Sequence, residues 1–244
     1  MNIAFGAFIN AMGILLGALL GLLLPKPLPV RTQVFLRSIL GAATTFVALR
    51  LVWLSINGTF WACLKQLAIA MVAVMLGHAL GKWLKLQKLS NRVGHRAVLI
   101  MENVQKHGLR HHADGFNACA ILLCSSPLGI VRALTDGLSG YFWLLALKGA
   151  IDAIAMASFV KMFRWPAAMA AFPVFLILSV ITIATRLYLA PFLDAHGLTQ
   201  SVNAAAGLVA SAVALVVLET RKVELANYLP ALVVAPILAW IIKW

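Results

Sequence analysis

The chain has 244 residues, of which 63% are hydrophobic and only 11% are charged, and its mean hydropathy is +0.97. A soluble domain carries about 25% charged residues, so this composition excludes a soluble globular domain and indicates an all-α polytopic membrane protein. The net charge of +13 is explained by basic cytoplasmic loops that face anionic lipid headgroups, in preference to a nucleic-acid surface. The three cysteines lie in apolar runs, which favours packing roles over a disulfide framework.

Eight stretches of the chain are long and apolar enough to cross a bilayer, which takes about 20 residues. Helix-breaking residues at Lys26-Pro27, Asn57-Gly58, Ser139-Gly140 and Trp165-Pro166 separate several of these stretches. We therefore predict a single transmembrane domain over residues 1–244, a helix bundle of about eight spans. The predicted spans are 3–24, 33–55, 60–82, 115–138, 141–162, 167–190, 200–218 and 225–243.

Lysine and arginine gather in alternate loops of this predicted bundle. They follow the first, third, fifth and seventh spans, whereas the intervening loops contain none. Because basic loops stay on the cytoplasmic side, the alternation predicts that both termini lie outside the cytoplasm. The first span lacks the basic start of a secretory signal and is longer than the apolar core of one, so we expect it to be retained.

The longest connection, residues 82–114, has the pattern of a basic amphipathic helix. Its apolar residues recur at three- and four-residue spacing in one stripe: Leu86, Leu89, Val93, Ala97, Ile100 and Val104. Four basic residues lie off that stripe: Lys85, Lys88, Arg92 and Arg96. We expect this helix to rest on the cytoplasmic membrane face and to contact anionic lipids, and we expect no nucleic-acid partner. The sharper alternatives are a calmodulin-like partner helix or a nucleic-acid contact.

A faint internal repeat is marked by Asn10, Asn117 and Asn203, each followed by alanine near the start of the first, fourth and seventh spans. This spacing predicts units of three helices. Consecutive units with an odd number of helices are inverted in the membrane, as in many secondary transporters. In this interpretation the three asparagines are supporting polar residues of the site, and the alternative is that each caps a helix.

Small residues recur along one face of the first span. Gly13, Gly17 and Gly21 are four residues apart, a spacing that permits another helix to approach closely. This face is suited either to packing inside the bundle or to joining two copies as a homo-oligomer, and the sequence leaves both open.

The fourth span is interrupted in its middle by Ser125, Ser126 and Pro127. Proline cannot donate to a preceding turn, and a serine followed by proline is a good start for a new helix. We predict a discontinuous helix whose second half presents a positive dipole end to an anion, while the carbonyls that end the first half suit a cation. An ordinary proline kink is the alternative.

Four ionisable residues follow this break within apolar sequence. Arg132 and Asp136 lie four apart on the second half-helix, and Lys148 and Asp152 lie four apart on the fifth span. A charge at bilayer depth costs about 2.5–3.5 kcal/mol on insertion scales, so it is paired or faces a polar cavity. We predict that Lys148 and Asp152 line a polar pathway, with a structural buried pair as the alternative. Arg132 and Asp136 are predicted to form an outer gate pair, with Asp136 close enough to the end of its span to be solvated.

A metal-like cluster of His107, His111, His112 and Asp114 is interrupted by Gly108 and lacks a further cysteine or carboxylate. We therefore interpret it as a solvated basic loop and predict no metal and no cofactor. The sequence shows no phosphate-binding glycine loop, nucleophile elbow or Ser-His-Asp arrangement, so we do not expect an enzyme.

Several segments resemble a family of bacterial inner-membrane proteins known as domain of unknown function 554. The segments are Cys124-Ser125-Ser126-Pro127, Asp136-Gly137-Leu138, Lys148 with Asp152, Asn10-Ala11 with Gly13 and Gly17, and the run Ala226-Asn227-Tyr228-Leu229-Pro230-Ala231-Leu232. The resemblance covers nearly the whole chain and implies an all-helical protein of the bacterial inner membrane, of a kind described as a candidate transporter. Many relatives have glycine before the proline, where this chain has Ser126.

Two functional hypotheses follow from these patterns. In the first, the chain is a transporter or channel for a small ion or polar solute: Asp152 binds a cation or cycles a proton, Lys148 tunes Asp152 or engages an anion, and Ser125, Ser126 and the Pro127 helix start coordinate the passenger. The alternative is a non-transporting membrane scaffold or anionic-lipid-binding protein that uses the basic connection. The sequence itself names no substrate.

Overall fold

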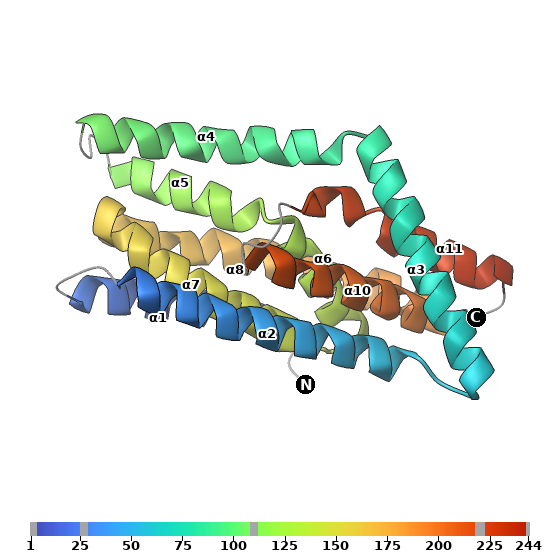
Figure 1. Cartoon of the computed structure of the whole chain (residues 1–244). Helices are drawn as coiled ribbons and strands as arrows, with labels where there is room; N and C mark the ends of the chain where they lie inside the picture. The colour runs from blue at the N-terminus through green and yellow to red at the C-terminus, as the bar shows by residue number, and fades with distance from the viewer. Residues whose placement is uncertain (1–3, 25–28, 108–111, 218–222, 243–244) are drawn as a thin grey trace.

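The computed structural model describes residues 4–24, 29–107, 112–217 and 223–242 and is all-α, with no strand in those ranges (Figure 1). The α-helices are α1 Phe5–Leu23, α2 Val30–Ser55, α3 Phe60–Trp83, α4 Leu86–His107, α5 His112–Cys124, α6 Pro127–Ser139, α7 Trp143–Phe163, α8 Ala171–Ala184, α9 Ala190–Ala195, α10 Thr199–Val217 and α11 Ala231–Ile242. Short 3₁₀ or π segments are η1 Trp165–Ala170, η2 Thr185–Leu189 and η3 Leu225–Tyr228.

Each of the eight predicted spans coincides with helix in the described ranges. Six segments are long and apolar enough to cross a membrane by themselves: α1, α2, α3, α7, the run Trp165–Ala195 and the run Leu225–Ile242. The pair α5 and α6 passes only as one bent span, which brings the number to as many as seven. The predicted seventh span is α10, which is not in this set. Large apolar side chains cover the outside of these helices, as lipid-facing surfaces require, so the chain is a polytopic helical membrane protein.

The glycine face of α1 packs against α7 along most of its length. A Cβ atom on Gly13 would lie 2.6 Å from the carbonyl oxygen of Gly149, and one on Gly17 would lie 2.2 Å from that of Ala153. Only glycine permits backbones to approach this closely. The contacts advance together along both helices, so α1 and α7 are parallel, as a first and a fifth span must be. The face therefore packs inside the bundle, and a homo-oligomer cannot use it.

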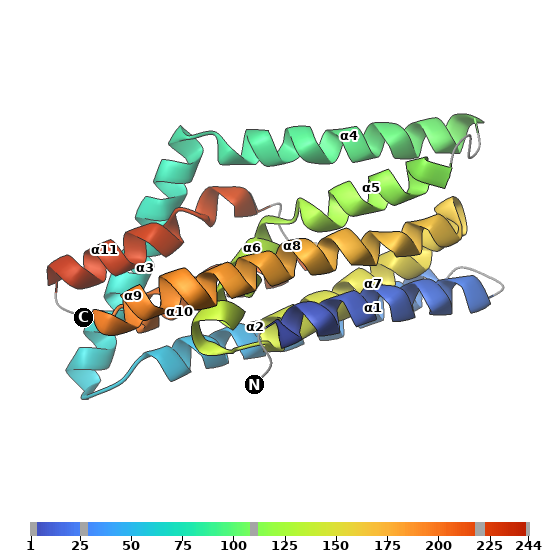
Figure 2. The ribbon, with the colours of Figure 1, turned by 180° about the vertical axis from the view of Figure 1, so that it is seen from behind.

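The half-helix α6 lies between two apolar clusters near the centre of the bundle (Figures 1 and 2). Its Ala133 belongs to a cluster formed with residues of α1, α5, α7 and α8. Its Val131 and Leu138 pack with residues of α9, α10 and α11. Because α6 is covered on both sides, Arg132 between these positions is enclosed by protein.

The predicted basic connection is helix α4, which packs along α5 (Figure 1). The four basic residues predicted to lie off its apolar stripe are all exposed: Lys85, Lys88, Arg92 and Arg96. The stripe itself is divided. Ala97 and Val104 are buried against the bundle, whereas Leu89 and Val93 are 60% and 40% exposed. The first half of α4 therefore presents apolar and basic side chains together on the outside.

The segment η3 holds the start of α4. The backbone N–H of Gln87 donates to Asn227 Oδ1 at 3.0 Å, and the backbone N–H of Ala226 donates to Gln87 Oε1 at 3.1 Å. Asn227 thereby satisfies one of the N–H groups that the first turn of a helix leaves free. These reciprocal bonds fix the elbow between α3 and α4, where Lys85 has a φ of +56°.

Candidate functional site

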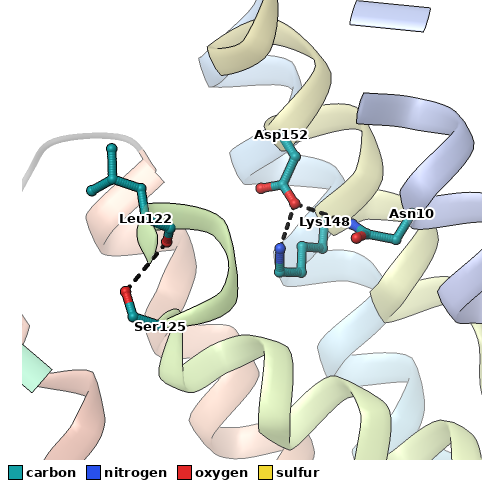
Figure 3. Close-up of polar contacts among 5 residues, drawn as sticks. All are labelled: Asn10, Leu122, Ser125, Lys148 and Asp152. Carbon is teal, nitrogen blue, oxygen red and sulfur yellow. Dashed lines mark hydrogen bonds and ion pairs between the residues drawn. The ribbon is translucent and has the colours of Figure 1, made fainter. Parts of the chain in front are cut away.

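Lys148 and Asp152 form a buried ion pair inside the bundle. They lie one turn apart on α7, and Lys148 Nζ bonds to Asp152 Oδ2. Asn10 of α1 donates from Nδ2 to the same carboxylate oxygen at 3.2 Å (Figure 3). Lys148 is 3% exposed and Asp152 8% exposed, so each charge depends on the other and on Asn10 for stabilisation.

The predicted interruption of the fourth span is confirmed. The axes of α5 and α6 differ in direction by 59°, Ser126 occupies the N-cap position with extended backbone, and Pro127 is the first residue of α6. The Ser126 hydroxyl makes no cap hydrogen bond to the described start of α6. Ser125 Oγ donates back to Leu122 O at 3.4 Å, within α5 (Figure 3). In this conformation the Ser125 hydroxyl is therefore bonded to its own helix.

The break lies beside the ion pair. Gly129, in the first turn of α6, faces α7, and a Cβ atom there would lie 3.3 Å from Lys148 Cε. Cys124, the last residue of α5, is within range of the charges on Lys148 and Asp152. The helix break of the fourth predicted span therefore lies next to the Lys148–Asp152 pair of the fifth.

Arg132 is buried without full hydrogen bonding. It is 1% exposed, and its Nε and Nη2 atoms have no hydrogen-bond partner in the described part of the chain. A buried donor that lacks a partner costs about 1–3 kcal/mol, and more when it is charged. The unpaired Nε and Nη2 donors of Arg132 therefore destabilise this conformation, and an acceptor at that edge would remove the penalty.

Asp136, on α6, packs against the start of α1 and is not solvated. It is 7% exposed, and its carboxylate packs against Gly6 in the first turn of α1. A Cβ atom on Gly6 would lie 2.6 Å from Asp136 Oδ2, so glycine makes room for the carboxylate. The positive end of a helix stabilises a carboxylate there. The expectation that Asp136 is solvated is wrong: α1 covers it, and its Oδ2 bonds to neither Nε nor Nη2 of Arg132.

The three asparagines of the predicted repeat have different environments. Asn10 is fully buried at the ion pair, and Asn203 is buried on α10, which packs mainly against α2. Asn203 Oδ1 has no hydrogen-bond partner within the described ranges. Asn117 is exposed on α5. Among the three, the structure brings only Asn10 to the Lys148–Asp152 pair.

Among the cavities formed by described residues, four that open between helices are lined by residues other than Lys148, Asp152 and Arg132. One of about 240 Å³ lies between α2 and α7 and is lined by Arg37, Ile151 and Ser158 among others. Because α7 turns Ile151 toward this cavity and Asp152 toward α1, the ion pair is separated from it.

Sequence patterns did not single out Gly6, Gly129 and Ser179. Gly6 and Gly129 make room for Asp136 and Lys148, and Ser179 is buried on α8 with its hydroxyl unpartnered in the described structure. The position of Gly6 one turn before Asn10 is the signal that could have identified it. Of the metal-like cluster, His111 lies outside the described residues, and the side chains of His107 and His112 are not described.

Comparison with known proteins finds matches that cover nearly the whole chain. The model of a family described as protein of unknown function (DUF554) matches residues 5–240, from α1 into α11. The chain is similar to the uncharacterized protein YqgA of Escherichia coli (strain K12), with 28% identity over 235 residues that cover 94% of each chain. No solved structure matches. Every residue of the candidate site lies within the matched range.

Proposed function

Because the chain belongs to the DUF554 family, whose description assigns no function, we propose a function from the site itself: a transporter or channel for a small ion or polar solute. The observation that carries this proposal is the buried Lys148–Asp152 pair beside the interrupted α5–α6 span. Ionisable residues inside a membrane bundle mark ion and substrate paths. Broken helices at membrane depth supply backbone groups that bind a passenger.

A succession of polar groups along α1 supports the same proposal. At the start of α1, Gly6 meets the carboxylate of Asp136. One turn further along, Asn10 bonds to Asp152. Lys148, the partner of Asp152, lies against α6 in its first turn. These contacts trace a polar line between α1, α6 and α7 that leads from one end of α1 to the break.

Asp152 and Lys148 have complementary roles in this proposal. A passenger cation or a proton binds Asp152 and displaces Lys148, which then turns toward the break and its helix start. Because both residues of the pair are buried, transport in this proposal includes an opening of α6 from α7. Ser125 and Ser126 provide hydroxyls at the point where the two half-helices can separate.

The test is ion flux in proteoliposomes, with protons, sodium and potassium as probes. Asp152→Asn should abolish the flux of the wild-type passenger, and Asp194→Asn, an exposed carboxylate on α9, should leave it unchanged. Since Asp152→Asn leaves Lys148 unpaired, the double variant Lys148→Gln/Asp152→Asn serves as a second test. It removes both charges and should fold but not transport. Normal flux in a folded double variant would contradict the proposal.

We also propose that the protein resides in the bacterial inner membrane with both termini periplasmic. The alternation of basic loops supports this orientation. The similarity to a protein of Escherichia coli supports the bacterial compartment. Reporter fusions at each terminus test it, because a periplasmic reporter should be active at both ends and a cytoplasmic one at neither.

The second candidate function is a scaffold that binds anionic lipid. The observation in its favour is the outer face of α4, where Lys88 and Arg92 are exposed beside Leu89 and Val93. This function predicts that replacing the four basic residues of α4 by glutamate abolishes function, whereas Lys148→Gln/Asp152→Asn is tolerated. The two candidates therefore make opposite predictions for the same pair of variants.

A further inference from the structure

The Nε and Nη2 atoms of Arg132 form one edge of the guanidinium that can donate to two oxygens of the same ligand. These two atoms lie side by side on the guanidinium and direct two parallel N–H bonds outward. Both are buried, and both lack a partner in the described structure. A carboxylate or another planar oxyanion has two oxygens that match this pair of donors, whereas a spherical anion such as chloride does not.

The buried charges of Lys148 and Asp152 already have partners. Lys148 is bonded to Asp152, which also accepts from Asn10. Asp136, one turn after Arg132 on α6, packs against Gly6 at the positive end of α1, and its Oδ2 also has no hydrogen-bond partner in the described structure. Lys148 therefore has an anionic partner within the chain, whereas the Nε and Nη2 donors of Arg132 have no acceptor in the described conformation.

We propose that Arg132 binds the carboxylate, or an equivalent planar oxyanion, of a small passenger through its Nε and Nη2 atoms. The inference rests on the proposed transport function and gives the passenger a chemical class. Binding there neutralises the charge of Arg132 and satisfies two buried donors at once. The passenger reaches Arg132 when α6 opens from α7, since Arg132 lies in the second turn of α6, just beyond the break.

Purified full-length protein in detergent micelles provides the first test. Thermal unfolding is followed in sodium acetate, sodium nitrate and sodium chloride at equal ionic strength. Acetate and nitrate should raise the melting temperature of the wild type in a saturable way, and chloride should not. This comparison needs no substitution, and equal behaviour in all three salts overturns the proposal.

Arg132→Lys tests the residue while keeping its charge. Lysine cannot present two parallel donors, so the apparent affinity for acetate should fall by about tenfold or more. The matched control is Arg50→Lys at an exposed position of α2, which should bind acetate as the wild type does. Unchanged acetate binding in a folded Arg132→Lys variant overturns the assignment.

Flux measurements on the same variants separate this inference from the transport proposal. If acetate and nitrate stabilise the protein but no probe, radiolabelled acetate included, shows flux, the Arg132 site is supported and the transport function is contradicted. Flux that is indifferent to oxyanions and is unchanged in Arg132→Lys keeps the transport function and removes the site. Acetate flux that is lost in Arg132→Lys and retained in Arg50→Lys supports both.

Discussion

Asn10 Nδ2 on α1 donates to Asp152 Oδ2 on α7 at 3.2 Å, although the two residues are 142 positions apart in the chain. The bond joins the first helix to the buried ion pair. It depends on the register of the α1–α7 contact, because a Cβ atom on Gly149 would lie only 3.0 Å from Asn10 Cα. The close packing of the α1 glycine face on α7 therefore sets the position of Asn10 beside Asp152.

Asn10→Ala should destabilise the protein by about 1–3 kcal/mol, because a buried carboxylate loses one of its donors. The measurement is the free energy of unfolding in detergent. Asn117→Ala is the matched control: this asparagine is exposed on α5, and its replacement should change stability by less than about 0.5 kcal/mol. Equal effects of the two substitutions would mean that the Asn10–Asp152 bond contributes nothing net.

Gly17→Ala should destabilise the protein by about 1–3 kcal/mol, because the added methyl would meet the backbone of Ala153 and force α1 from α7. The control is Gly94→Ala on α4, where a Cβ atom meets nothing within 4 Å. That change should be neutral or stabilise by up to about 1 kcal/mol through helix propensity. A shift of melting temperature in the same direction for both variants would contradict the described contact.

Asp152→Asn alone should cost about 3–5 kcal/mol, because it leaves Lys148 as an unpaired buried cation. Lys148→Gln/Asp152→Asn should cost clearly less than the sum of the two single changes, because the double variant contains neither charge. A double-mutant cycle on the free energy of unfolding measures this coupling. Additive effects would show that the two charges do not interact in the folded protein.

Asn227→Ala should loosen the start of α4, because the backbone N–H of Gln87 loses its acceptor. Hydrogen exchange of the amides in the first turn of α4 should accelerate about fivefold or more, the equivalent of about 1 kcal/mol of lost protection. Asn91→Ala is the control, since Asn91 is exposed and accepts only from the Gln87 side chain. Unaltered exchange in Asn227→Ala would show that η3 does not hold the elbow.

Local features of the fold were accessible from the sequence. Apolar runs of span length predicted where the helices lie, because each helix satisfies its own backbone hydrogen bonds. The break at Ser126 and Pro127 was predictable, because proline removes a donor whatever surrounds it. The presence of charge in apolar sequence identified Lys148 and Asp152 as a candidate site, because the cost of burying charge does not depend on the details of packing.

Only the tertiary structure decided which surfaces meet. The spacing of Gly13 and Gly17 shows that a helix can approach, and the fold shows that the helix is α7. Position near a span end suggested that Asp136 is solvated, but the start of α1 covers it. Whether a given side chain is buried, paired or left with a free edge, as Arg132 is, depends on helices far away in sequence. The sequence by itself determined which segments are helical and where charge lies within apolar sequence, since those are local properties of the chain, and the packing of distant helices determined the site.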